Sequence, residues 1–257
     1  MILKLLVLFF TPLLSGLAVF LVPGGKSTSF KLLLVFAGAY LFAITIIHIL
    51  PELYHQPVGV EYIGIFVLIG FFLQQVLEYF TAGIEHGHMH RHTPPGQRGH
   101  PYHTHTHQSI SAIVLLMALC IHAFLEGGML AQSTTIDVSY DVYAILLGIA
   151  LHRAPAAFAL MTVLTHKLGA RMRAIPYLVG FSLAAPLGLL ISTLLAEYEI
   201  LTGEGMIFLY AVVCGNFLHI STTIVFESSP EHRFNPKKLT VAMAGSLVAV
   251  LVEYGLM

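Results

Sequence analysis

The sequence predicts an all-α polytopic membrane protein with eight transmembrane helices. Hydrophobic residues make up 57% of the 257 residues and charged residues only 10%, whereas about a quarter of the residues in a typical soluble domain are charged. The mean hydropathy of +0.84 agrees with this composition. So few charged side chains cannot cover a water-facing surface, which excludes a soluble enzyme. The net charge of -1 excludes a nucleic-acid-binding protein.

Eight apolar runs are long enough to cross a bilayer, which takes about 20 residues of helix. None of them alternates between apolar and polar residues as the strands of a membrane barrel do. We expect transmembrane helices at 4–22, 31–51, 61–82, 109–131, 142–163, 174–196, 205–226 and 239–257. The connections are short, except for 83–108. We therefore expect a single transmembrane domain over 1–257, although the first run also resembles a secretory signal peptide without a clear cleavage site.

Lysine and arginine fall almost entirely in alternate connections. Ten of the twelve basic residues lie there: Lys26, Lys31, Arg91, Arg98, Lys167, Arg171, Arg173, Arg233, Lys237 and Lys238. The connections on the other side carry acidic residues instead. Because positively charged connections stay in the cytoplasm, we expect both termini to face outward and 83–108 to be cytoplasmic.

Ionisable side chains inside the spans point to a metal site. His122 and Glu126 are four residues apart, so a helix places them on one face. His152 lies near the middle of the next span, which runs antiparallel, so all three can reach one depth. Two imidazoles and one carboxylate suit Zn²⁺, and Fe²⁺, Mn²⁺, Co²⁺ and Cd²⁺ accept similar ligands. The alternative is that His122 and Glu126 form a hydrogen-bonded pair that only helps helices associate.

The connection 83–108 is unusually rich in histidine. Its eight histidines are His86, His88, His90, His92, His100, His103, His105 and His107. Spaced imidazoles on a flexible chain are weak and labile metal ligands. We expect a cytoplasmic segment that binds metal weakly; the alternative is a solvated linker that has no role in binding.

Two motifs carry a resemblance to a known family. The stretch His122-Ala123-Phe124-Leu125-Glu126-Gly127 resembles the His-Asn-x-Pro-Glu-Gly signature of the ZIP family of divalent-metal (zinc/iron) transporters. The stretch 152–157 resembles that family's His-x-x-Pro-Glu-Gly signature, and shorter similarities are found at 48–52, 185–188 and 215–218. The eight spans, the outward termini and the His-rich connection between spans three and four also match.

The resemblance implies a fold and a function. Spans one to three and six to eight would form inverted repeats around spans four and five, a 3+2+3 arrangement. The protein would not be an enzyme; it would carry a divalent metal ion, with zinc favoured, toward the cytoplasm as a transported substrate and would hold no permanently bound cofactor. His122, Glu126 and His152 would form the transport site. We also expect a surrounding lipid bilayer, a homodimer, and a location in the cell membrane, which in a bacterium is the inner membrane.

The chain departs from the family pattern at three positions near this site. Relatives with two metal ions carry asparagine or an acidic residue where this chain has Ala123, Ala156 and Ala185. We therefore expect one bound metal ion rather than two. Arg153 follows His152 directly, and we hypothesise that its guanidinium replaces the second cation and pairs with Glu126. The alternative is that Arg153 packs against another polar helix.

Four other polar residues lie along the expected path. His48 and Glu52, at the outer end of span two, would form an entrance for metal, unless they only cap the helix end. Glu78 and His219, toward the inner ends of spans three and seven, would line the exit, unless neighbouring helices satisfy them. Released metal would then reach the His-rich connection.

Two other functions would use the same residues. An intramembrane zinc-dependent hydrolase would need a further ligand and an open position for an activated water. A metal sensor would bind metal without letting it pass. Movement of metal across a sealed vesicle distinguishes transport from both.

Overall fold

The structure is a computed structural model, and it describes residues 1–21, 27–56, 59–81, 112–131, 142–227 and 236–255. The expected His-rich connection, with all eight of its histidines, lies outside the described residues. The described elements are helices: α1 (Ile2–Leu17), η1 (Ala18–Phe20), α2 (Ser27–Ile44), η2 (Thr45–Ile49), α3 (Leu50–His55), α4 (Val60–Thr81), α5 (Ala112–Met129), α6 (Val142–Leu168), α7 (Arg171–Glu197), α8 (Gly203–Glu227) and α9 (Pro236–Gly255). Within the described residues, 8 helical segments are long and apolar enough to cross a membrane. The predicted all-α polytopic fold is therefore confirmed.

Several helices extend past the apolar runs that predicted them. α6 continues to Leu168 instead of ending near 163, because His166 and Lys167 are compatible with a helix that leaves the hydrocarbon region. The helix stops at Gly169, which has a positive φ of 65°, the conformation that glycine adopts at many helix ends. An apolar run thus marks the part of a helix that lies in the membrane rather than the whole helix.

The second span consists of three consecutive helical pieces. α2 leads into η2, a π-helical turn, and α3 continues the span to His55. Pro51 lies in the first turn of α3, where a missing N–H is tolerated. His48 lies inside the π-helical turn, a local geometry that is frequent at functional sites.

The helices pack in two groups. In the first group, α1 contacts α6 and α7, and α7 also contacts α5 and α6. In the second group, α8 contacts α2 and α4, and α2 also contacts α9. The groups meet where α6 packs on α2 and where α5 packs on α4 and α8.

These contacts have the symmetry of two inverted repeats. Exchanging α1 with α7, α2 with α8, α4 with α9 and α5 with α6 converts the α4–α8 contact into α9–α2 and the α5–α7 contact into α6–α1. It also converts α2–α6 into α8–α5. Because α1 is the first span and α7 the sixth, the two cross the membrane in opposite directions. The packing agrees with the predicted 3+2+3 arrangement.

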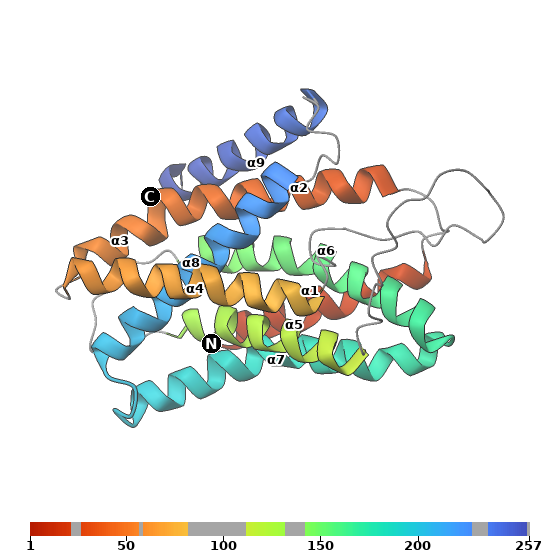
Figure 1. The fold of residues 1–257 in the computed structure, drawn as a ribbon, viewed down its shortest axis with the longest axis horizontal. Coiled ribbons are helices and arrows are strands. Elements are labelled where there is room, and N and C mark those ends of the chain that lie inside the picture. The colour runs from red at the N-terminus through yellow and green to blue at the C-terminus, as the bar shows by residue number, and fades with distance from the viewer. Residues whose placement is uncertain (22–26, 57–58, 82–111, 132–141, 228–235, 256–257) are drawn as a thin grey trace, which may run out of the picture.

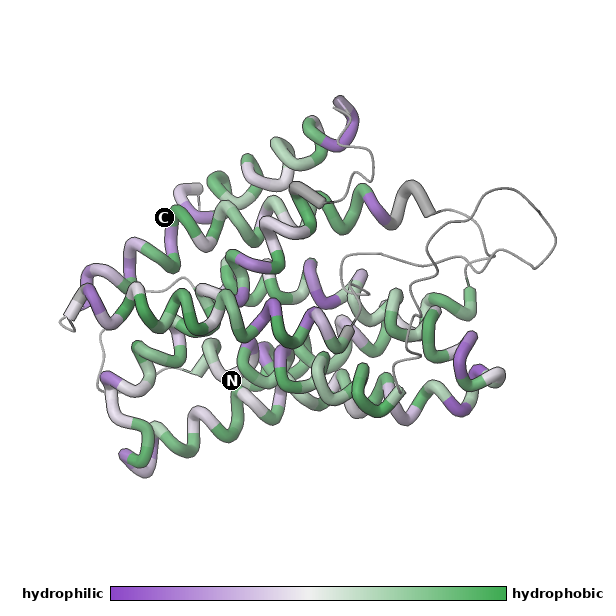
Figure 2. The backbone as a smooth tube through the Cα atoms, in the orientation of Figure 1, coloured by the Kyte–Doolittle hydropathy of each residue, from purple (hydrophilic) through white to green (hydrophobic). Residues whose placement is uncertain are grey.

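Both chain ends lie toward the same end of the bundle, the end at which α7 stops and α8 starts (Figure 1). This agrees with the prediction that the two termini share one side of the membrane. Hydrophobic residues line the lengths of the helices, and hydrophilic residues gather at the helix ends and near the middle of the bundle (Figure 2).

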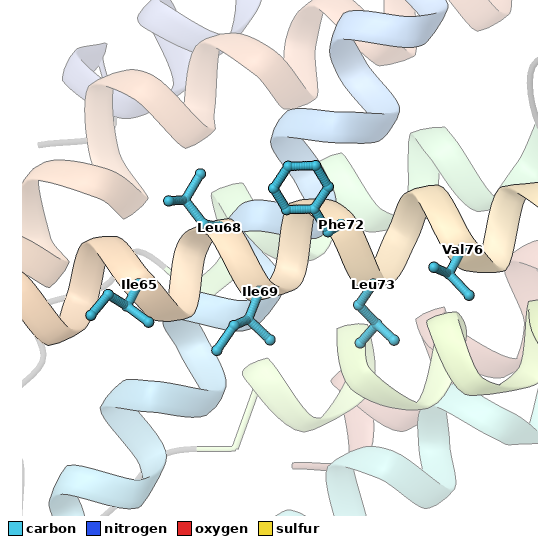
Figure 3. Close-up of a pocket in the computed structure, with 6 residues that line it drawn as sticks. All are labelled: Ile65, Leu68, Ile69, Phe72, Leu73 and Val76. Atoms are coloured by element: carbon cyan, nitrogen blue, oxygen red, sulfur yellow. The ribbon is translucent and has the colours of Figure 1, made fainter.

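The outward side of α4 carries a shallow apolar hollow (Figure 3). Leu68 and Phe72 are each 58% exposed there. The hollow is lined by Ile65, Leu68, Ile69, Phe72, Leu73 and Val76. An apolar surface of this kind suits contact with lipid chains. Ionisable residues of membrane spans usually face the interior of the bundle instead.

Candidate metal centre

α5 supplies two of the residues that the sequence singled out. His122 and Glu126 are 3% and 0% exposed, and His122 Nε2 lies 3.1 Å from Glu126 Oε1. The four-residue spacing places the two side chains one above the other on a single helix face. A carboxylate in this position is removed from water and needs a cationic or hydrogen-bonding partner.

α6 brings His152 to the same place. His152 is 1% exposed, and its ring centroid lies 5.9 Å from that of His122, with the rings nearly perpendicular at 87°. One ligand atom from each of His122, Glu126 and His152 lies within 4.8 Å of the other two. A tetrahedral zinc ion with bonds of about 2.0–2.1 Å would hold its ligand atoms roughly 3.3 Å apart. A small movement of these side chains would therefore close the cluster around an ion.

Two glycines let α5 and α7 cross at the level of this cluster. A Cβ atom on Gly127 would lie 2.0 Å from the Ala185 carbonyl oxygen, and one on Gly188 would lie 2.0 Å from the Phe124 carbonyl oxygen. The two backbones therefore touch directly, which only glycine permits. Since Gly127 follows Glu126 in the chain, this crossing fixes the height of the carboxylate.

Arg153 is buried beside the cluster, with an exposed fraction of 1%. Its Nη2 donates a hydrogen bond of 2.9 Å to the Phe181 carbonyl of α7, and its guanidinium lies 4.8 Å from the centroid of the Phe181 ring. The charge of Arg153 interacts with that of Glu126, yet no ion pair within 4.0 Å joins these two described residues. The expected direct pair with Glu126 is thus not formed, because the side chain reaches α7 instead.

At the expected outer end, His48 contacts an acidic residue of another helix. The His48 ring contacts the Glu253 carboxylate of α9 through Nδ1, and both side chains are buried. Glu52 instead accepts a hydrogen bond of 2.9 Å from Gln56, one turn along α3. The structure thus adds Glu253 beside His48, and the role of His48 and Glu52 as an entrance for metal stays a prediction.

At the inner end, the structure pairs the two expected exit residues with each other. His219 Nε2 of α8 lies 2.7 Å from Glu78 Oε2 of α4. The ring of Phe71 meets that of His219 edge-on at a centroid distance of 4.8 Å. The two residues are 141 positions apart in the chain, so only the packing of α4 on α8 brings them together.

Sequence reasoning missed Glu253. The signal was available, because Glu253 is an acidic residue inside the otherwise apolar run 239–257. It lies near the end of the run, where residues in contact with water are common. In the structure it is 5% exposed.

The fold and the site together define a class: an α-helical, multi-pass membrane protein that has a buried His/Glu cluster in its interior. The sequence comparisons then identify the family. The profile of the ZIP zinc transporter family matches residues 1–257. The chain belongs to this family, as its two central motifs suggested.

Individual members of the family share between 25% and 34% of their residues with this chain over the matched segments. Zinc transporter ZIP9-A of Xenopus laevis is 30% identical over 172 residues, which cover 64% of this chain and 52% of the relative. Zinc transporter ZIP9 of Macaca fascicularis is 34% identical over 116 residues, covering 42% and 48% respectively. Zinc transporter ZIP1 of Danio rerio is 25% identical over 212 residues, covering 72% and 69%. The matched part of the chain spans about half the length of these ZIP9 relatives.

Proposed function

We propose that this protein transports a divalent transition metal ion across a membrane toward the cytoplasm, with zinc as the favoured substrate. The observation that carries the proposal is the convergence of His122, Glu126 and His152 on one buried point inside the membrane-spanning bundle. Ionisable groups at that depth cost free energy, so they are rare and mark functional sites by default. Membership of the ZIP zinc transporter family supports the same substrate.

The ligand set suits an ion that has to be released again. Two imidazoles and one carboxylate leave a fourth position open on zinc, whereas structural zinc sites are closed by four protein ligands. Fe²⁺, Mn²⁺, Co²⁺ and Cd²⁺ accept the same ligands, so the proposal covers them as weaker candidates. Acid should weaken binding, because protons compete with the metal for the imidazoles and the carboxylate.

The path of the ion would run through the two outlying His–Glu pairs. His48 and Glu52, with Glu253 in contact with His48, would receive metal at the outer end. Glu78 and His219 would release it at the inner end. The eight histidines of 83–108 would then bind it weakly in the cytoplasm.

The proposed partners are the lipid bilayer, the metal ion and a second copy of the chain, and the proposal includes no permanently bound cofactor. The compact chain favours the cell membrane, which in a bacterium is the inner membrane. The relatives described above are vertebrate proteins and support only the integral membrane location. Size measurement of the purified protein in lipid nanodiscs would test the homodimer.

Zinc uptake into sealed proteoliposomes tests the proposal, with a zinc-sensitive dye enclosed inside. The wild type should show a zinc-dependent signal that a folded His122→Ala/Glu126→Ala variant has lost. The matched control is His166→Ala/Glu197→Ala, which removes the same residue types from exposed helix ends and should transport normally. A folded wild type that binds zinc but moves none would overturn the proposal and favour a sensor or a hydrolase.

A further inference from the structure

Two nitrogens of the Arg153 side chain donate no hydrogen bond to any described residue. One of its nitrogens, Nη2, binds the Phe181 carbonyl, but Nε and Nη1 have no hydrogen-bond partner among the described residues. A guanidinium carries five N–H donors in a fixed plane and keeps its charge inside proteins. Buried donors of this kind are costly when unpaired. Nε and Nη1 therefore have no hydrogen-bond acceptor among the described residues.

The missing acceptor belongs beside the metal cluster. Arg153 follows His152 on α6, contacts Phe181 on α7, and interacts electrostatically with Glu126 on α5. The guanidinium thus lies among the three helices that form and support the cluster. An acceptor that met its unpaired nitrogens would stand close to an ion held by His122, Glu126 and His152.

The charge of the occupied cluster points to an anion as that acceptor. Without a metal ion, the charges of the Glu126 carboxylate and the Arg153 guanidinium sum to zero. A divalent ion raises the sum to two positive charges. Among the described residues the other buried carboxylate is that of Glu253, which already contacts His48. A doubly positive site in the interior of a membrane protein is unfavourable without a counter-charge.

We propose that the metal-loaded centre binds a small monovalent anion, such as chloride or a short carboxylate. The anion occupies the fourth position of the metal ion and accepts hydrogen bonds from Arg153. It supplies the acceptor that the guanidinium lacks and removes one of the two positive charges. This inference rests on the proposed function, because it takes His122, Glu126 and His152 as the ligands of the ion.

Co²⁺ binding to the purified full-length protein tests the proposed anion site without any transport step. Co²⁺ replaces zinc at such ligands, and its visible absorption reports the atoms bound to it. Titrations would be run at equal free Co²⁺ and equal ionic strength in sodium gluconate, sodium chloride and sodium formate. In the wild type, chloride or formate should shift the absorption band and raise the Co²⁺ affinity about 10-fold over gluconate, the scale of one charge-assisted hydrogen bond.

Two variants connect the effect to Arg153. Arg153→Met keeps the apolar length of the side chain and should bind Co²⁺ with the same affinity in all three salts; Arg153→Gln serves if the methionine variant does not fold. Arg173→Met removes an exposed arginine from the start of α7 and should keep the full anion effect. Ala156→Glu places a carboxylate one turn from His152. This variant should bind Co²⁺ with high affinity in gluconate, without added chloride or formate.

The outcomes separate this inference from the proposed function. Identical spectra and affinities in the three salts would mean that water fills the fourth position, and would overturn the anion site while leaving transport intact. An anion effect that persists in Arg153→Met would also overturn it. Failure of the wild type to bind Co²⁺, or binding that survives His122→Ala/Glu126→Ala, would instead overturn the metal centre itself.

Discussion

The central cluster and the two outlying His–Glu pairs use the same residue types in different ways. The cluster gathers three ligand atoms within 4.8 Å of one another from neighbouring spans. Each outlying pair has one histidine and one glutamate, and comes from helices of the other packing group. Three ligands can hold an ion at one point, whereas two can only bind it weakly, as conduction requires at the ends of a path. Ligand number, rather than ligand type, therefore distinguishes the central cluster from the two outlying pairs.

The two pairs are also related to each other. The helix exchange that relates the repeats replaces α2 with α8 and α9 with α4. It therefore converts the His48–Glu253 pair into the His219–Glu78 pair. The outer and inner pairs occupy equivalent places at opposite ends of the molecule, so we expect them to contribute equally, and both less than the centre.

The largest effect should come from Glu126→Gln, which removes the only carboxylate of the cluster without changing its shape. Uptake should fall by more than about 100-fold, since loss of even an outer partner of a metal ligand costs roughly 10–100-fold. Initial zinc uptake rates in proteoliposomes measure this, with Glu197→Gln at an exposed helix end as the control. Uptake within 10-fold of the wild type would show that His122, Glu126 and His152 do not form the transport site.

A second prediction concerns the crossing that holds the centre in place. Gly127→Ala should lower the free energy of unfolding by about 1–3 kcal/mol, as overpacking does, and should weaken metal binding, because the Ala185 backbone must move. Gly180→Ala is the matched control, since its nearest neighbour, Leu116, is 4.0 Å from the new Cβ. Thermal unfolding in detergent and Co²⁺ titration give the two readouts. Equal stability of the two variants would contradict the direct backbone contact.

Smaller and similar effects should follow from Glu253→Gln and Glu78→Gln. Each should reduce uptake roughly 10-fold, the lower end of what loss of a metal ligand's outer partner costs. Adding His48→Ala to Glu253→Gln should reduce uptake little further, because the effects of substituting two contacting residues do not add. A loss at one end without any loss at the other would break the equivalence of the two pairs.

The smallest effect should come from Glu52→Gln. Glu52 is half-buried and accepts a hydrogen bond from Gln56 within its own helix, whereas the carboxylate that contacts His48 is that of Glu253. We expect uptake to change less than about 2-fold, since substitutions outside buried networks change free energies within roughly 0.5 kcal/mol. A loss of uptake as large as that of Glu253→Gln would contradict this and would make Glu52 an equal member of the entrance.

The eight spans, their alternating direction and the meeting of His122, Glu126 and His152 could be predicted from the order of residues alone. These features depend on apolar run length, on the four-residue spacing along one helix, and on two spans that are neighbours in the chain. The contact of His48 with Glu253, the hydrogen bond from Arg153 to the Phe181 carbonyl, and the contact of Gly127 with Ala185 became visible in the folded bundle. Those contacts join segments far apart in the chain or depend on how one helix is rotated and tilted against another. Such angles come from the packing of the whole bundle, and no local pattern of residues records them.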